Sequence, residues 1–217
     1  MPTPRAGYRL ADGTRVPGVT TINGQLGWNK NPLMWWAWNE GREGRDFRDT
    51  SKKAADVGTI AHAMVEAEVH RSVFDPSPYD PELVKLAEPT LAAYREWAKQ
   101  VSLEIVETEI QLVSEAYRYG GTPDAVGLVS GRLRLLDFKT SKAVYADFLL
   151  QLAAYHHLWN ENREQRPLAP GAFLLRIGKD GGFAYHSYTE QVLDRAWVAF
   201  LHAKALYDLR KPLEDAA

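Results

Sequence analysis

Apolar residues recur every three or four positions in several stretches of the chain, which is the period of an amphipathic helix. In residues 54–71, for example, Val57, Ile60 and Met64 would line one face. The stretch after the next proline-rich connector has the same period, and so do two stretches in the second half of the chain. The pattern predicts helices over residues 54–71, 81–100, 145–160 and 190–209.

In the middle of the chain the apolar period changes to two, which is typical of β-strands. Ser130-Gly131 between two such stretches indicates a tight hairpin turn, and residues 179–182 indicate another. A pair of short apolar runs around Asp12-Gly13 indicates a hairpin near the N-terminus. The pattern predicts strands over residues 8–10, 16–22, 103–113, 117–129, 132–140, 172–177 and 183–188.

The composition is that of a globular protein, with 45% hydrophobic and 25% charged residues among 217. No repeat, low-complexity segment or clear domain boundary divides the chain, which favours a single domain. Cysteine is absent, which excludes disulfides, thiol nucleophiles and cysteine-ligated iron–sulfur clusters. No apolar run approaches the length of about 18 residues that a membrane span needs, and the N-terminus does not resemble a signal peptide. We therefore expect a soluble, cytoplasmic protein.

The formal net charge of −2 provides no overall attraction to nucleic acid. A nucleic-acid-binding protein of this charge would need a local basic surface. One segment in the first quarter of the chain contains Arg42, Arg45, Arg48, Lys52 and Lys53. These cations are compatible with a solvated helix face and equally with a rim that contacts phosphates.

Tryptophan is concentrated near the N-terminus, because four of the seven tryptophans lie between residues 28 and 38. Asn31 is expected to cap a helix here, with Pro32 at its first position. Most of these rings are expected to pack that helix onto the main body. The alternative is that some of them, such as Trp35, stack on unpaired bases, which aromatic faces do without sequence preference.

Two carboxylates, a lysine and a histidine are the candidate chemical groups. Asp137 and Lys139 are two positions apart on a predicted strand, so they point to the same side. Asp124 follows a glycine-containing turn on the adjoining strand, and His62 lies on the preceding helix. Carboxylates suit Mg²⁺ or Mn²⁺, and an imidazole favours Mn²⁺. Such an ion activates water and neutralises phosphate charge, so the set predicts a phosphodiester hydrolase.

The sequence lacks the motifs of other reaction types: it has no G-x-S-x-G of serine hydrolases, no Walker A loop and no dinucleotide-binding fingerprint. Each candidate also has an ordinary structural explanation. Asp124 could be a turn residue, Lys139 a surface lysine, and His62 a buried histidine or half of a surface pair with Glu66. Gly58, one turn before His62, is costly inside a helix and indicates close packing at that point.

Four motifs connect these residues in chain order. They are Gly58-x-x-x-His62-x-x-x-Glu66, Gly121-Thr122-Pro123-Asp124, Asp137-Phe138-Lys139-Thr140 and Gln151-x-x-x-Tyr155. Together they resemble the motifs of the PD-(D/E)XK nuclease superfamily, in particular of its RecB-like and phage-type exonucleases. A bare D-x-K occurs by chance in many chains, whereas four motifs in this order on the expected elements are improbable by chance.

The resemblance spans residues 54–178 and implies an α/β (α+β) fold with a restriction-endonuclease-like core. In that core a central mixed β-sheet is flanked by helices in the order α-β-β-β-α-β. Residues 1–53 would form a tryptophan-rich N-terminal extension made of a hairpin and a helix. Residues 179–217 would add the partner strand of a hairpin and a C-terminal helix, so that residues 1–217 form one nuclease domain.

The resemblance also implies roles for the central residues. Asp124 and Asp137 would bind the metal, and the backbone carbonyl of Phe138 would be a further ligand. His62 would complete the metal shell, and Lys139 would activate or hold the attacking water. The cofactor would be Mg²⁺ or Mn²⁺, as one or two ions, and the lack of cysteine excludes the iron–sulfur members.

Further roles follow for residues around this centre. Gln151 and Tyr155 would steady the lysine end of the site and touch the substrate. Glu109, on the first core strand, would have a secondary role toward metal or water. The other candidates for substrate contact are Glu66, Thr140, Ser141, Arg42, Arg45 and Trp35.

The function implied is that of a metal-dependent DNA exonuclease in phage or bacterial recombination, replication or end processing. DNA would be the partner, and a phage recombination or replication protein and an oligomeric state are compatible with it. Two alternatives remain open: a structure-specific endonuclease with the same site, and a non-cleaving nuclease-like subunit that binds nucleic acid. The intact Asp-Asp-Lys set favours an active enzyme, because a binding module has no need of two carboxylates where phosphates must lie.

Overall fold

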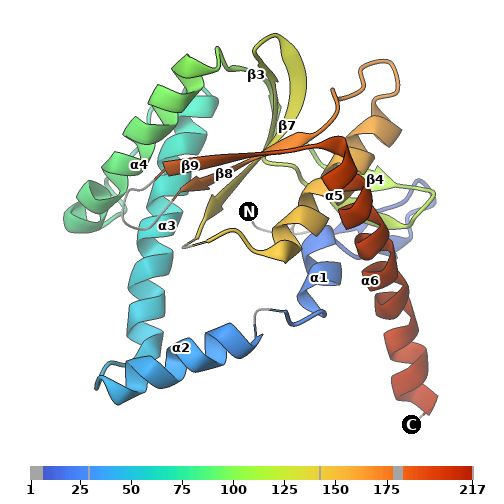
Figure 1. Ribbon diagram of the computed structural model, residues 1–217, viewed down its shortest axis with the longest axis horizontal. Coiled ribbons are helices and arrows are strands. Elements are labelled where there is room, and N and C mark those ends of the chain that lie inside the picture. Colours follow the sequence, from blue (N-terminus) through green and yellow to red (C-terminus); the bar gives the residue numbers. More distant parts are fainter. Residues whose placement is uncertain (1–6, 29, 142, 178–182, 217) are drawn as a thin grey trace.

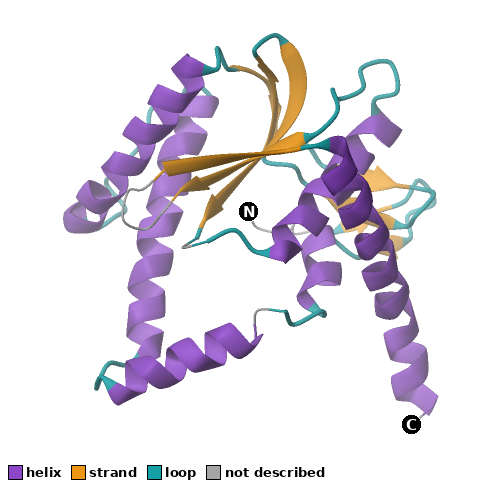
Figure 2. Ribbon diagram, viewed as in Figure 1, coloured by secondary structure: helices purple, strands orange, loops and turns teal. Residues whose placement is uncertain are grey.

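The computed structural model describes residues 7–28, 30–141, 143–177 and 183–216, and its centre is a five-stranded mixed sheet (Figure 1, Figure 2). The strands are β3 (Glu104–Thr108), β6 (Ala125–Val129), β7 (Arg132–Thr140), β8 (Ala172–Ile177) and β9 (Phe183–Tyr188). Their order in the sheet is β3-β6-β7-β8-β9. β7 and β8 are parallel, and the other neighbours are antiparallel.

Helices cover both faces of this sheet (Figure 1). Their bounds are α1 (Val19–Gly24), α3 (Phe47–Val69), α4 (Pro81–Gln100), α5 (Ala146–Asn162) and α6 (Glu190–Ala216). α3 and α4 pack on one face, and α5 and α6 pack on the other with α1 beside them. This is the central mixed sheet flanked by helices that the sequence predicted. Within the described ranges, no helix is both long and apolar enough to cross a lipid bilayer.

β7 divides its side chains between the two faces, as a period of two predicts. Leu136 and Phe138 are buried in the cluster that includes residues of α3 and α4, whereas Leu135 is buried in the cluster built on α5. Asp137 and Lys139 share the side of Leu135 and therefore point toward α5. The middle strand of the sheet thus carries a fully buried carboxylate, that of Asp137.

The continuous strands predicted over residues 103–113 and 117–129 are wrong. β3 ends at Thr108 and a separate strand, β4 (Leu112–Ser114), follows it. In the same way, three residues separate the end of β5 (Tyr119–Gly121) from the start of β6. β4 and β5 pair with each other in a separate, two-stranded sheet. The two chain segments are therefore paired antiparallel twice, as β3 with β6 and as β4 with β5, with an unpaired gap in each segment between the two pairings.

The two interruptions face each other. The backbone N–H of Glu109 donates to the carbonyl of Asp124 at 3.0 Å, and Glu109 has a φ of +49°. Pro123 has no N–H to offer to a ladder. Because both chain segments leave the regular β-conformation at this point, the side chain of Asp124 does not have to alternate between the two faces of the sheet. It can instead point into the interior of the protein.

The strand predicted over residues 16–22 is also wrong. β1 (Tyr8–Arg9) and β2 (Arg15–Val16) form the expected N-terminal hairpin, but the chain then enters α1. Val19 and Ile22 are three positions apart and are 1% and 0% exposed, because one face of a helical turn packs them against α5 and α6. Two apolar residues at this spacing fit a short helix better than a strand.

Two predicted helix boundaries move by seven residues. α3 begins at Phe47 because the Asp46 side chain caps it, accepting the N–H of Arg48 at 2.8 Å. The basic segment around Arg48 is therefore largely the start of this helix. α6 continues to Ala216 instead of ending at residue 209. The predicted bounds of α4, β8 and β9 agree with the structure, and the predicted turn at 179–182 lies outside the described residues.

The predicted helix with Pro32 at its first position begins two residues earlier, so α2 (Lys30–Arg42) contains Asn31 instead of being capped by it. The prediction that most nearby tryptophans pack in the core is wrong. Trp28, Trp35 and Trp38 are 49%, 67% and 57% exposed. The tryptophans that the core does bury completely, such as Trp97 of α4, come from later in the chain.

Tyr94, buried between α4 and β7, is expected to make the fold sensitive to alkaline pH. Burial raises the pKa of its phenol from 10.0 to about 12, so the folded protein keeps a proton that the unfolded chain loses. The stability that depends on this proton is complete below pH 10 and is lost as the pH rises toward 12. Between pH 9 and pH 11, Tyr94→Phe should lose about 1 kcal/mol less free energy of unfolding than the wild type. Urea titrations at several pH values measure this difference, and equal losses in both proteins would contradict it.

Candidate active site

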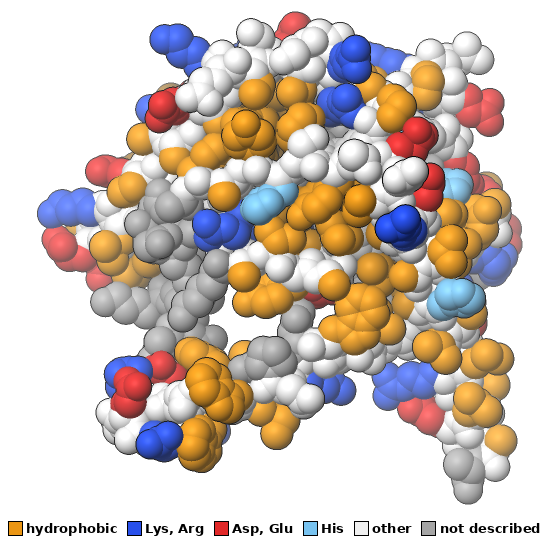
Figure 3. Space-filling model, viewed as in Figure 1, with side chains coloured by type: hydrophobic (Ala, Val, Ile, Leu, Met, Phe, Trp, Pro, Cys, Tyr) orange, Lys and Arg blue, Asp and Glu red, His pale blue; other side chains and the backbone are white. Residues whose placement is uncertain are grey.

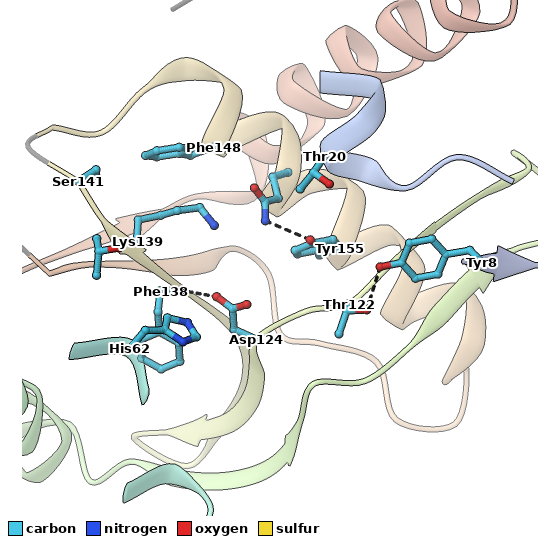
Figure 4. A pocket seen from close by; sticks show the side chains of 12 residues that line it. Tyr8, Thr20, His62, Thr122, Asp124, Phe138, Lys139, Ser141, Phe148 and Tyr155 are labelled. Carbon is cyan, nitrogen blue, oxygen red and sulfur yellow. Dashed lines mark hydrogen bonds between the residues drawn. The ribbon is translucent and has the colours of Figure 1, made fainter. Parts of the chain in front are cut away.

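The described residues enclose a cavity of about 280 Å³ beside the end of β7 (Figure 4). Residues from α3, α5, β7 and the segment between β5 and β6 meet here. The lining residues are Tyr8, Thr20, His62, Thr122, Asp124, Phe138, Lys139, Thr140, Ser141, Phe148, Gln151 and Tyr155. Eight of the predicted site residues are therefore brought together: His62, Asp124, Phe138, Lys139, Thr140, Ser141, Gln151 and Tyr155.

Asp124 lies at the interruption before β6 and is 7% exposed. Its Oδ2 accepts the backbone N–H of Phe138 at 2.8 Å (Figure 4). Burial raises the pKa of this carboxyl, although Lys139 and the hydrogen bond from Phe138 act in the opposite direction. A simple turn residue would face solvent, so the explanation of Asp124 as a turn residue is incomplete.

Asp137 is held from two sides. The Nζ of Lys139 lies 2.5 Å from its Oδ2, and the Nε2 of Gln151 donates to its Oδ1 at 3.3 Å. Burial raises the pKa of Asp137 to about 7; Lys139 opposes this rise and Asp124 adds to it. Gln151 also donates to the hydroxyl of Tyr155 at 3.1 Å, so one turn of α5 holds the carboxylate in place.

Lys139 is an interior residue, with a side chain that is 17% exposed. Burial lowers its pKa, but the carboxylates of Asp137 and Asp124 outweigh that effect and the net shift is upward. Its Nζ also lies 5.5 Å from the centroid of the Phe148 ring. The explanation of Lys139 as an ordinary surface lysine is therefore excluded.

Gly58 allows α3 to bring His62 close to β7. A Cβ atom at Gly58 would lie 3.2 Å from the Oγ1 of Thr140, which confirms the close packing expected there. His62 is 24% exposed, and its Nδ1 is 3.8 Å from the Oε2 of Glu66. Burial lowers the pKa of His62, which favours the neutral imidazole that binds metals.

Four residues of the cavity were not predicted from the sequence: Tyr8, Thr20, Thr122 and Phe148. The hydroxyl groups of Tyr8 and Thr122 are hydrogen-bonded at 2.9 Å. The signal that could have found this wall is Gly120-Gly121, since glycine inside a strand indicates the close approach of another group. A Cβ atom at Gly120 would lie 2.2 Å from the Cγ of Tyr8.

Gly121 is expected to be intolerant of any side chain. A Cβ atom there would lie 2.6 Å from the Cε1 of Tyr155 and 2.9 Å from the Cδ1 of Leu158. Gly121→Ala should therefore reduce the free energy of unfolding by about 1–3 kcal/mol, as overpacking of a core does. Gly41→Ala is the matched control, because nothing lies within 4 Å of a Cβ at this position in α2. Urea unfolding of both variants checks this, and equal stability would contradict it.

Comparison with known proteins decides the family. The sequence model of the PD-(D/E)XK nuclease superfamily matches residues 31–212, a range that includes the whole central sheet. The chain belongs to this superfamily. Pro123-Asp124 and Asp137-Phe138-Lys139 have the spelling of the motif in the superfamily name, and the five-stranded mixed sheet flanked by helices is the restriction-endonuclease-like fold of this superfamily. No curated protein matches the chain.

Solved structures are similar to this nuclease at low identity. One, named "Putative exonuclease" from Eubacterium rectale, is 14% identical over 69% of this chain and 68% of that chain, with a TM-score of 0.43. SSO0001 is 16% identical over 67% of this chain and 74% of that chain, with a TM-score of 0.32. LHK-Exo in complex with dAMP is 12% identical over 75% and 91%, also with a TM-score of 0.32.

Nucleases of this superfamily generally use divalent metal ions, and the donor groups of the cavity suit one. Asp124 and Asp137 are buried carboxylates whose raised pKa values reflect the cost of burying negative charge, which a cation would offset. Phe138 and His62 line the same cavity. These four residues would hold the ion. The side-chain ligand atoms of His62, Asp124 and Asp137 are not all within 4.8 Å of one another, and Lys139 is the cation that Asp137 contacts.

A second group of metal-ligand side chains lies outside the cavity. Glu66, His70 and Glu109 each offer one atom within 4.8 Å of the others, the one such trio in the described part of the chain. The prediction that Glu109 lies on the first core strand is wrong. Glu109 lies in the turn after β3, because the chain leaves the sheet at Thr108. Neither Glu66 nor Glu109 lines the cavity at β7, and a metal role for Glu109 would belong to this outer group.

Three residues predicted to contact substrate also lie outside the cavity: Arg42, Arg45 and Trp35. They belong to α2 and the segment after it. Arg45 forms ion pairs with Glu40, at 2.8 Å, and with Glu43, so its charge is already neutralised. Any contact that Arg42 and Trp35 make with a nucleic acid therefore lies outside this cavity.

Proposed function

We propose that this protein is a divalent-metal-dependent deoxyribonuclease that hydrolyses phosphodiester bonds at DNA ends. The observation that carries the proposal is the convergence of Asp124, which directly precedes β6, with Asp137 and Lys139 of the neighbouring strand β7. Asp124 and Lys139 line one cavity, and the buried carboxylate of Asp137 contacts Lys139. A bound Mg²⁺ or Mn²⁺ would stabilise phosphate charge and make water more acidic. In this proposal the chain acts as a single nuclease domain, with residues 54–178 as its catalytic core.

The protein groups of the cavity would orient the reactants. Lys139, whose ammonium form is stabilised by the ion pair with Asp137, acts as a donor that holds the attacking water or the charged phosphate oxygen. Gln151 fixes Asp137, and Tyr155 fixes Gln151, through the hydrogen bonds of α5. Asp124 has one oxygen committed to the N–H of Phe138, which leaves the other for a cation.

The depth of the site supports attack at an end of the DNA. Asp137 is fully buried and Lys139 is 17% exposed, so a scissile phosphate must reach the bottom of the cavity. A chain end enters such a recess more easily than the middle of a stiff duplex does. An exonuclease of this kind would serve recombination, replication or end processing in a phage or a bacterium.

The test is incubation of the purified protein with linear and covalently closed circular DNA in Mg²⁺, Mn²⁺ or EDTA. We expect degradation of linear DNA with either metal, intact circles, and no reaction in EDTA. Cutting of circular DNA would refute the exonuclease activity and support the alternative, a structure-specific endonuclease with the same site. Binding without any cleavage would instead identify a nuclease-like subunit, and cleavage in EDTA would refute the metal requirement.

A further inference from the structure

One side of α2 carries large exposed side chains that the catalytic cavity does not use. Trp35 and Trp38 are 67% and 57% exposed, and Met34 is 69% exposed. Lys30, Met34, Trp38 and Arg42 recur every four positions and, with Trp35 beside them, form one stripe along the helix. We call these five residues the α2 stripe. Figure 3 shows hydrophobic side chains gathered on the visible face of this helix.

The α2 stripe is not the side by which α2 packs on the protein. That side carries Trp36, which contacts Phe47 of α3 edge to face with ring centroids 6.4 Å apart, and Glu40, which is 7% exposed. Because α2 already has a packing side, folding does not require the rings of Trp35 and Trp38. Contiguous exposed apolar side chains of this size mark a binding surface.

Cations accompany the exposed rings at this end of the molecule. The guanidinium of Arg42 lies 4.7 Å from the centroid of the Trp38 ring, and that of Arg48 lies 5.6 Å from the Phe47 ring. Among the ion pairs between described residues, Arg42 and Arg48 take no part, in contrast to Arg45. An apolar partner would bury such guanidinium groups without a counter-charge, at a high cost. A nucleic-acid strand supplies phosphates and flat rings together.

α2 is connected on both sides to walls of the cavity. It joins α1, which contributes Thr20, to α3, which contributes His62. Along the axis of α3, His62 lies about 22 Å from Phe47, at about 1.5 Å per residue. A strand stacked at about 3.4 Å per nucleotide covers this distance in about six nucleotides. Figure 3 shows an open gap between α2 and the body of the molecule.

We propose that the α2 stripe is a stacking platform for a single-stranded segment of nucleic acid whose end lies in the catalytic cavity. Unpaired bases stack on Trp35 and Trp38, and the adjacent phosphates pair with Arg42 and Lys30. A duplex keeps its bases stacked on each other, so the platform selects unpaired strands. The inference rests on the proposed nuclease function, yet binding to the stripe is separable from cleavage.

The test is binding without cleavage, in EDTA, of an oligothymidylate of about 16 nucleotides, a length at the upper end of the site sizes of stacking domains. Stacking should quench the tryptophan fluorescence. Trp35→Ala and Trp38→Ala should each weaken binding about tenfold. Arg42→Ala should weaken binding and reduce its dependence on salt, because one phosphate contact is lost. A blunt duplex should bind more weakly and should not respond to the tryptophan substitutions.

Matched controls come from α6, where Leu209 and Leu213 are 54% and 65% exposed. Leu209→Ala and Leu213→Ala should leave oligonucleotide binding unchanged, and thermal melts confirm that every variant is folded. Wild-type affinity in both tryptophan variants would overturn the proposal. It would also be overturned if light scattering showed a dimer that Trp35→Ala dissociates while oligonucleotide affinity stays unchanged, since the stripe would then be an interface between two copies.

Cleavage assays separate the failure of this proposal from the failure of the proposed function. An inert protein whose oligonucleotide binding depends on Trp35 and Trp38 would refute the nuclease function and support the platform. An active nuclease whose oligonucleotide affinity is unchanged in the Trp35 and Trp38 variants would refute the platform alone. A protein with neither property would refute both.

Discussion

Asp137→Asn is expected to reduce DNA cleavage by about a thousandfold or more, which is at least the cost of removing one electrostatic group from an active site. The amide has the shape of the carboxylate and can still accept the hydrogen bond from Gln151, but it has no negative charge for a cation. Initial rates on linear DNA in saturating Mg²⁺ or Mn²⁺ measure the loss. Turnover within about tenfold of the wild type would remove Asp137 from the mechanism.

The same substitution should also change the pH dependence of stability. Burial raises the pKa of Asp137 to about 7, so the folded state disfavours the ionised form. In the wild type this penalty is absent below pH 3.8, grows as the pH rises, and is complete above about pH 7. The melting temperature of Asp137→Asn relative to the wild type, measured in EDTA, should therefore rise between pH 5 and pH 8. A constant difference would show that the carboxylate is not penalised.

Lys139→Met is expected to reduce cleavage by about 10²- to 10³-fold. Methionine keeps most of the length of the buried stem but removes the ammonium that lies 2.5 Å from the Oδ2 of Asp137. The carboxylates of Asp137 and Asp124 then lose their protein counter-charge, and the water or phosphate loses its donor. Single-turnover rates with excess enzyme separate this effect on the chemical step from any effect on DNA binding.

The matched control for this position is Lys139→Arg. A guanidinium keeps the charge but is larger and planar, so we expect a partial loss of about tenfold. If Lys139→Met and Lys139→Arg lose the same activity, the shape of the side chain matters and its charge does not. That result would contradict the role given to the ammonium group.

The central motif could be predicted from the sequence because its geometry is local. A period of two is sufficient to place Asp137 and Lys139 on one side of β7 and Phe138 on the other. The hydrogen bonds of Gln151 and Tyr155 are equally local, since four positions in a helix make them neighbours. Both arrangements depend only on the number of positions between the residues, which can be read directly from the sequence.

The interruption that positions Asp124 could not be predicted in the same way. It depends on the pairing of Glu109 with Asp124 across two strands, and alternation alone favoured two continuous strands. As a result, the predicted location of Glu109 on a core strand was wrong, and its neighbours Glu66 and His70 could not be foreseen as a group. Contacts between distant segments decide such features.

Burial of individual aromatic residues was the other failure. Four tryptophans close together suggested a core element, because large rings are usually inside. Trp35 and Trp38 are nevertheless exposed, since Trp36 supplies the ring contact that α2 makes with α3. Helical periodicity shows that a helix has sides, but only the neighbouring elements decide which side they cover.

The wall of the cavity that includes Tyr8 has a consequence for how the enzyme is made. Tyr8 is bonded to Thr122, 114 positions later, and the N–H of Gly120 donates to the carbonyl of Pro17 at 2.9 Å. Because these partners are more than a hundred residues apart, this wall of the cavity cannot close during translation until the chain through Thr122 has been synthesised. The segment that contains Tyr8 and Pro17 therefore waits for its partners, and the cavity is completed only after the sequence around Gly120 has emerged.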